Sequence, residues 1–132
     1  MWSNLPDLGT GILYVIVLLA AYTFAVSLAA GAGRPRLLAS ARLGSYAVCA
    51  TISVATLLLA YAFITHDFRL RYVARYSDRS LTDGYLFSSL WGGQDGSLLW
   101  WLCLLGGYTA VCVRWLKGRY RQLQPYIIAT LM

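Results

Sequence analysis

The residues best suited to a binding role lie in one short stretch, Trp91-Gly92-Gly93-Gln94-Asp95-Gly96-Ser97, called the glycine motif below. Glycine lets the backbone adopt positive φ or approach a neighbour closely, so three glycines predict shaped backbone rather than regular helix. Asp95 and Ser97 are favourable N-cap residues, so we expect one of them to cap a helix that begins within two residues of Ser97. Tryptophan suits the depth where lipid headgroups meet hydrocarbon. The motif therefore predicts a helix entrance at a membrane surface, with Gly92 and Gly93 outside the helix.

Three arginines precede the glycine motif at a helical spacing. Arg71, Arg75 and Arg79 stand four residues apart, so on a helix they would share one face. Such a face is typical of a solvated surface that meets lipid headgroups. It could equally be a docking strip for a ligand or partner that bears carboxylates, because the guanidinium group offers a bidentate fork. The sequence leaves both interpretations open.

The residue combinations that carry most enzyme chemistry are missing from this sequence. His66 is the one histidine, so neither a histidine-paired metal site nor a two-histidine haem site can be built here. Cys49, Cys103 and Cys112 lie within apolar runs and form no Cys-x-x-Cys pair, which favours a packing role. No Ser-His-Asp set and no phosphate-binding loop occurs. The sequence therefore identifies no catalytic set and no metal site.

Composition and the apolar runs predict an all-α, polytopic integral membrane protein. The chain is 59% hydrophobic and 12% charged. Roughly 20 helical residues cross a hydrocarbon core, and single spans in lipid must be helical. We predict three complete transmembrane helices over about 11–33, 43–65 and 97–113, and the start of a fourth from about 125. An outer loop over 66–96 joins the second and third spans, and we expect one membrane domain that is an N-terminal fragment of a longer protein.

The distribution of charge predicts the orientation of these spans. The connections 34–42 and 114–121 hold seven of the eleven basic residues and no acidic residue. The positive-inside rule places such connections in the cytoplasm, so the N-terminus and the 66–96 loop are predicted to lie outside. This topology accounts for the net charge of +6 through contact with the lipid bilayer. Nucleic acid is not implied as a partner.

The glycine motif and the residues before it resemble a known family. The similar positions are Leu59-Ala60-Tyr61-Ala62-Phe63, Tyr72-Val73-Ala74, Ser77, Leu81, Tyr85, Trp91-Gly92-Gly93 and Gly96-Ser97-Leu98-Leu99. Together they are similar to the CcmF family of cytochrome c-type biogenesis proteins, which are haem lyases, and to its NrfE relatives. The chain departs from the family's common residues at Asp78, Thr82, Gly84, Leu86 and Gln94. Leu86 replaces a common lysine and Gln94 a common histidine, so roles assigned to those side chains do not carry over.

The resemblance implies a multi-pass protein of the bacterial inner membrane that serves cytochrome c maturation. Family members take haem from a periplasmic haem chaperone and attach it covalently to apocytochrome c at the outer face, together with other maturation subunits. Two thioether bonds join the haem vinyl groups to cysteine thiols of a Cys-x-x-Cys-His motif. The family's haem-ligand histidines lie further along the chain and match no position here. The resemblance thus implies haem as the cofactor, with a scaffold and outer docking role for this segment.

Two other functions fit a small polytopic segment. A half of a secondary transporter would use a glycine-broken helix as its substrate site, near the middle of the bilayer. The spans predicted here hold only scattered Ser, Thr, Tyr and Cys, and the glycine break lies at a surface. A membrane-anchoring subunit without chemistry of its own is the other alternative, and it remains open from the sequence.

Overall fold

The computed structural model describes residues 5–65, 71–76, 88, 92–116, 120 and 122–132. These residues form an all-α structure without β-strands, which confirms the predicted fold class. Its helices include α1 (Leu5–Gly31), the 3-10 helix η1 (Pro35–Leu37), α2 (Leu38–Ile64), α3 (Arg71–Tyr76), α5 (Gln94–Trp115) and α6 (Gln124–Leu131).

Three of the helices are long and apolar enough to cross a membrane, as the sequence predicted. They cover Asp7–Gly31, Pro35–Ile64, where η1 runs into α2, and Gln94–Trp115. α6 is a fourth helix, beginning at Gln124. α1, α2 and α5 begin several residues before the predicted spans, because a count of apolar residues matches the hydrocarbon core and omits the polar turns at its edges.

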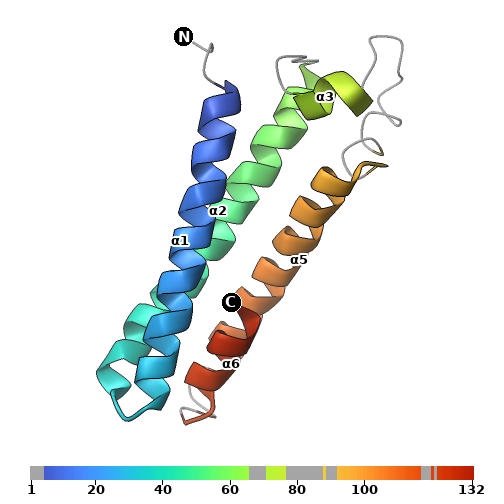
Figure 1. Cartoon of the computed structure of the whole chain (residues 1–132). Coiled ribbons are helices and arrows are strands. Elements are labelled where there is room, and N and C mark those ends of the chain that lie inside the picture. Colours follow the sequence, from blue (N-terminus) through green and yellow to red (C-terminus); the bar gives the residue numbers. More distant parts are fainter. Residues whose placement is uncertain (1–4, 66–70, 77–87, 89–91, 117–119, 121) are drawn as a thin grey trace.

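α2 occupies the centre of the arrangement and packs against both α1 and α5 (Figure 1). α1 and α2 are joined by a tight connection in which Gly33 has a φ of 98°, a conformation that favours glycine. α6 turns back from the end of α5 and packs mainly against α1. One end of this bundle, the motif end, holds the starts of α1 and α5 and the end of α2. The opposite end, the arginine end, holds 30–42, 113–116, 120 and 122–126.

Small residues allow the central helix to approach both neighbours. A Cβ added at Gly44 of α2 would collide with Thr23 of α1, whose Cβ and Cγ2 would lie only 3.2 Å away. On the other side, a Cβ at Gly106 of α5 would contact the Cα of Cys49 at 3.5 Å. Close backbone approach at small residues is a common basis of helix packing in lipid, where the hydrophobic effect does not drive helices together.

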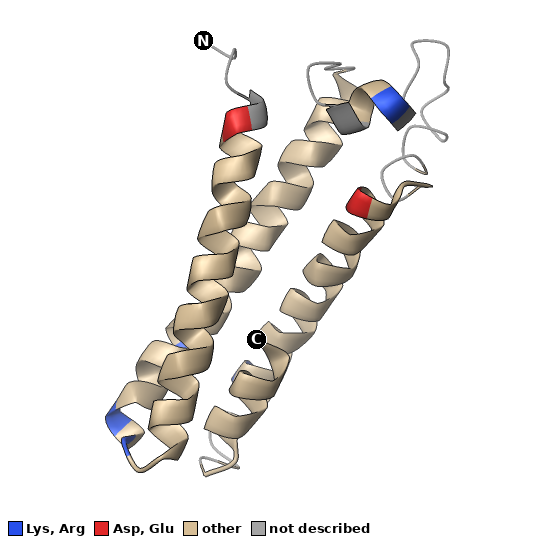
Figure 2. Cartoon of the chain, viewed as in Figure 1, with Lys and Arg blue, Asp and Glu red and all other residues tan. Residues whose placement is uncertain are grey.

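Charged residues gather at the two ends of the bundle (Figure 2). Asp7 and Asp95 lie in the first turns of α1 and α5, where a carboxylate interacts favourably with the helix dipole. The arginine end holds Arg34, Arg36, Arg42 and Arg114. The sequence has no acidic residue between 8 and 66 or between 96 and 132, so that end is uniformly cationic.

Large apolar side chains remain exposed along the length of the bundle. Tyr14, Val17 and Leu18 of α1 are 64–69% exposed, and Trp101 of α5 is 68% exposed. A soluble domain rarely leaves so continuous an apolar surface. In a bilayer these faces are available to lipid or to other membrane helices.

Candidate functional site

The helix entrance predicted from the glycine motif lies at the motif end of the bundle, where α5 begins at Gln94. Gly93 is the N-cap and has extended backbone, with φ −106° and ψ 163°. Gly92, directly before it, has helical conformation, so Gly93 separates α5 from the preceding segment. The chain therefore breaks at Gly93, and both Gly92 and Gly93 lie outside α5 as predicted. The start itself comes three residues earlier than Ser97, so the last three residues of the predicted 66–96 loop are helical.

The prediction that Asp95 or Ser97 caps this helix is wrong. No side chain caps α5, and Asp95 lies exposed in its first turn. The Ser97 hydroxyl instead donates to the Gln94 carbonyl at 2.9 Å, and the Ser97 N–H donates to the Gly93 carbonyl at 3.1 Å. Since the helix starts before both residues, their side chains are past the cap position and Ser97 bonds back into its own turn.

The motif's glycines act through burial rather than through positive φ. Among the described residues, the one glycine with positive φ is Gly33, far from the motif. Gly93 and Gly96 are buried, whereas Gln94 and Asp95 between them are exposed. Gly92 is exposed, and a Cβ added to it would contact nothing within 4 Å. The motif thus presents one buried glycine side and one polar side, and Gly92 carries no steric requirement in the described structure.

The arginine strip is described in part. α3 spans Arg71–Tyr76, so positions 71 and 75 belong to one helix and are one turn apart along it. Val73, between them in sequence, is fully buried, and Arg75 is exposed. α3 therefore turns Val73 inward and Arg75 outward. The other predicted member, Arg79, lies outside the described residues, as do Trp91 and His66.

The described motif end does not offer the ligands of a haem iron. Haem iron in proteins is held by imidazole, thiolate, thioether or phenolate groups. The described residues at this end include no histidine, cysteine or methionine, and no cluster of three potential metal ligands occurs in the described part of the chain. Tyr61 is exposed near the end of α2 and has no described imidazole or thioether beside it. This donor set does not fit a haem site, so no haem chemistry is derived from these residues.

A buried polar network at the arginine end was not predicted from the sequence. The Gln124 side chain is fully buried. Its Oε1 accepts hydrogen bonds from Nε of Arg42, at 3.0 Å, and from Nη2 of the same guanidinium. Its Nε2 donates to the Val113 carbonyl at 3.0 Å. One amide therefore links α2, the last turn of α5 and the start of α6. The sequence signal for it was an amide directly before Pro125, at the start of an apolar run.

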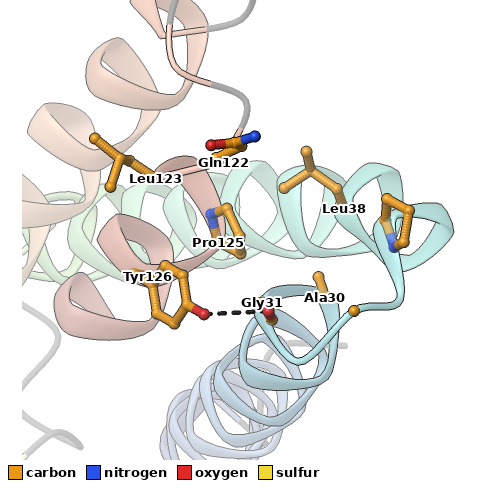
Figure 3. Close-up of a pocket in the computed structure, with 9 residues that line it drawn as sticks. Ala30, Gly31, Leu38, Gln122, Leu123, Pro125 and Tyr126 are labelled. Atoms are coloured by element: carbon orange, nitrogen blue, oxygen red, sulfur yellow. Dashed lines mark hydrogen bonds between the residues drawn. The ribbon is translucent and has the colours of Figure 1, made fainter.

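A groove lies beside this network, between the end of α1 and the start of α6 (Figure 3). Its volume is about 720 Å³. Tyr126 and Pro125 of α6 face Ala30 and Gly31 of α1 across it. The Tyr126 hydroxyl donates to the Gly31 carbonyl at 3.1 Å, and a Cβ at Gly31 would lie 2.9 Å from Tyr126 Cζ. Glycine at position 31 thus lets the tyrosine ring close one side of the groove.

Comparison with known proteins finds similarity over most of the chain. CcmF from Escherichia coli K12, a cytochrome c-type biogenesis protein, is 33% identical over 106 residues, which cover 80% of this chain. CcmF from Pseudomonas fluorescens is 53% identical over 51 residues, or 39% of the chain. NrfE from Haemophilus influenzae, also a cytochrome c-type biogenesis protein, is 34% identical over 110 residues and 80% of the chain.

The chain is a relative of the CcmF and NrfE proteins. This confirms the resemblance that the glycine motif and its flanks carry. The chain spans only a small part of these relatives, 16% of the Escherichia coli CcmF and 17% of the Haemophilus influenzae NrfE. No family profile matches the chain, and no solved structure matches it.

The described helices lack the break that the substrate site of a secondary transporter would use. Discontinuous helices with unwound backbone near the bilayer midplane are the usual substrate sites of secondary transporters. α1, α2 and α5 each run without a break, and the glycine break precedes α5. No described feature therefore favours the transporter alternative.

Proposed function

We propose that this chain serves cytochrome c maturation, as part of a protein that handles haem and attaches it covalently to apocytochrome c. The observation that carries the proposal is the similarity to CcmF and NrfE proteins over 80% of the chain. Within that activity the chain is a membrane scaffold. Its motif end holds a partner or the rest of the haem site, with a periplasmic haem chaperone, apocytochrome c and other maturation subunits as the partners.

The exposed chemistry of the motif end supports a docking role. Gln94 and Asp95 are exposed in the first turn of α5, and Arg75 is exposed in the last turn of α3. These side chains offer donors and acceptors to a protein surface without offering an iron ligand. The buried glycine side of the motif meanwhile allows close packing behind that surface. The motif end therefore suits recognition, with bond-making groups supplied from elsewhere.

The function is tested by deleting the gene and measuring covalent haem in c-type cytochromes. Haem that survives denaturing electrophoresis reports thioether attachment, and b-type cytochromes in the same membranes serve as the control. We expect c-type haem to be lost while b-type haem persists. Normal c-type haem in the deletion strain would refute the maturation role and would leave the membrane-anchor alternative.

The docking role is tested with Arg75→Gln and Gln94→Ala in the full chain, because both side chains are exposed. We expect normal abundance in the membrane and reduced covalent haem in a reporter cytochrome. Gln122→Ala, exposed at the opposite end, is the matched control and should leave attachment unchanged. Unchanged attachment in the motif-end variants would refute docking there. A parallel fall of abundance and attachment would assign these residues to packing.

We also propose an N-outside orientation in the bacterial inner membrane. The support is the concentration of arginine at one end of the described bundle, since basic connections stay in the cytoplasm. Single cysteines at the exposed positions Ser88 and Gln122 would test it, in a chain whose own cysteines are replaced. In intact cells with a permeable outer membrane, a membrane-impermeant maleimide should label position 88 and not position 122. The reverse pattern would invert the topology.

A further inference from the structure

We propose that the groove at the arginine end is a seat for one anionic phospholipid, such as phosphatidylglycerol, from the adjacent leaflet. In this arrangement an acyl chain occupies the groove between α1 and α6. The phosphate lies against the connection that carries Arg34 and Arg36. This inference rests on the membrane-spanning fold and holds whether or not the chain serves cytochrome c maturation.

The groove has the size and lining that a lipid chain requires. Its volume of about 720 Å³ is within the range of small-molecule sites. Leu38, Leu123 and Pro125 are its apolar lining residues, of which Leu38 and Pro125 are buried. Leu123 is 55% exposed, so the groove opens outward rather than enclosing a void. It lies where α1 ends and α6 begins, which places it at the edge of the hydrocarbon core when α1 spans the bilayer. A lipid can enter such a groove sideways from the leaflet.

The positive charge of Arg34 and Arg36 at the edge of the groove favours a lipid with an anionic headgroup. Gly33 and Pro35 both line the groove, so Arg34 lies between two lining residues and Arg36 follows them directly. Both arginines are exposed, and neither guanidinium group has a hydrogen-bond or ion-pair partner among the described residues, although the Arg34 carbonyl accepts from the Leu37 N–H. Arg42, in contrast, is already bonded to Gln124. Two available guanidinium groups, at an end without acidic residues, complement a phosphate that carries net negative charge.

Binding of one lipid by Arg34 and Arg36 beside the groove can be distinguished from the general attraction of a basic loop to an anionic membrane. A diffuse basic surface responds to the number of charges and retains no individual lipid. Retention of one lipid at a specific site depends on which arginine is removed and on whether the groove is open. Arg114 provides the comparison, because it is exposed at the same end, in the last turn of α5, and does not line the groove.

The first test maps lipid contacts on the unmutated full chain, reconstituted in bilayers that contain phosphatidylglycerol with a photoactivatable acyl chain. After irradiation, crosslinked peptides are identified by mass spectrometry. We expect crosslinks concentrated at Leu38, Leu123 and Tyr126 above the level found on the exposed face of α1 at Val17 and Leu18. An even spread over all lipid-exposed residues, or no crosslink in the groove because protein covers it, would overturn the proposal.

The second test measures retention of phosphatidylglycerol by native mass spectrometry of the purified full chain. Arg34→Gln and Arg36→Gln should each weaken retention by about fivefold, the effect expected for one arginine at a lipid headgroup. Leu123→Trp, which fills the groove, should abolish the bound lipid. Arg114→Gln is the charge-matched control and should leave retention unchanged. An equal loss in Arg114→Gln, or equal retention of zwitterionic phosphatidylcholine, would overturn the proposal.

Discussion

The two ends of the bundle are built on different physical principles. At the arginine end, side chains join the helices: Gln124 links three of them, and Tyr126 bonds to the Gly31 carbonyl of α1. At the motif end, α5 begins without a side-chain cap, and the polar residues Gln94 and Asp95 remain exposed. Side-chain hydrogen bonds between helices are thus described at the arginine end, whereas Gln94 and Asp95 at the motif end are exposed. We therefore expect substitutions at the arginine end to cost more stability than substitutions of the exposed residues at the motif end.

The packing beside the arginine end should be the most sensitive part of the chain. In Gly44→Leu the new side chain meets the fully buried Thr23, so α1 and α2 must separate. We expect the free energy of unfolding in detergent to fall by about 3 kcal/mol or more, the upper end of the range for overpacked cores. Gly107→Leu, with nothing within 4 Å of its Cβ, is the control and should be close to neutral. Similar losses in both variants would contradict close α1–α2 contact as the cause.

The Gln124 network should give the next largest effect. Gln124→Leu removes the acceptor for Arg42 and the donor to the Val113 carbonyl, so two polar groups lose their partner. We expect a loss of about 2–3 kcal/mol in the free energy of unfolding, measured by denaturant titration in detergent. Gln122→Leu, where the amide is exposed, should change stability by less than about 0.5 kcal/mol. Equal stability of the two variants would remove the network as a source of stability.

Tyr126→Phe should have a smaller effect at the same end. The substitution keeps the ring over Gly31 and deletes only the hydroxyl that donates to the Gly31 carbonyl. A single hydrogen bond of this kind contributes about 1 kcal/mol, and exposure to water reduces that value. Tyr120→Phe, which is also exposed, serves as the control in the same thermal unfolding measurement. A loss as large as that of Gln124→Leu would mean that the hydroxyl has a further role.

The smallest changes are expected at the motif end. Ser97 does not cap α5, so Ser97→Ala should cost less than the roughly 1 kcal/mol typical of a lost cap. Gly92→Ala should stay within about 0.5 kcal/mol, because Gly92 has open space and no positive φ. Both are measured by unfolding in detergent beside the arginine-end variants. Losses at the motif end that match those at Gln124 would refute the contrast between the two ends.

Much of the motif end could be anticipated from local sequence, but its details could not. Glycine content predicted a break before the third helix, and the chain does break at Gly93. The cap was assigned to the wrong residues. Asp95 or Ser97 could cap α5 only if the helix began directly after that residue, but α5 begins at Gln94. Burial of Gly93 and Gly96 decides which side of the motif is packed, and burial depends on neighbours that are distant in sequence.

The sequence by itself determined the class of the protein, its three long apolar helices and the cationic character of one end. These properties follow from the length of apolar runs and from the order of charges, which no packing can change. Only the tertiary structure decided which faces meet, because helices that are apolar all round carry no amphipathic signal to mark the packed side. It also decided that Gln124 is buried against Arg42, 82 residues away in sequence. A hydrogen bond across that separation exists only because α2, α5 and α6 converge at the arginine end.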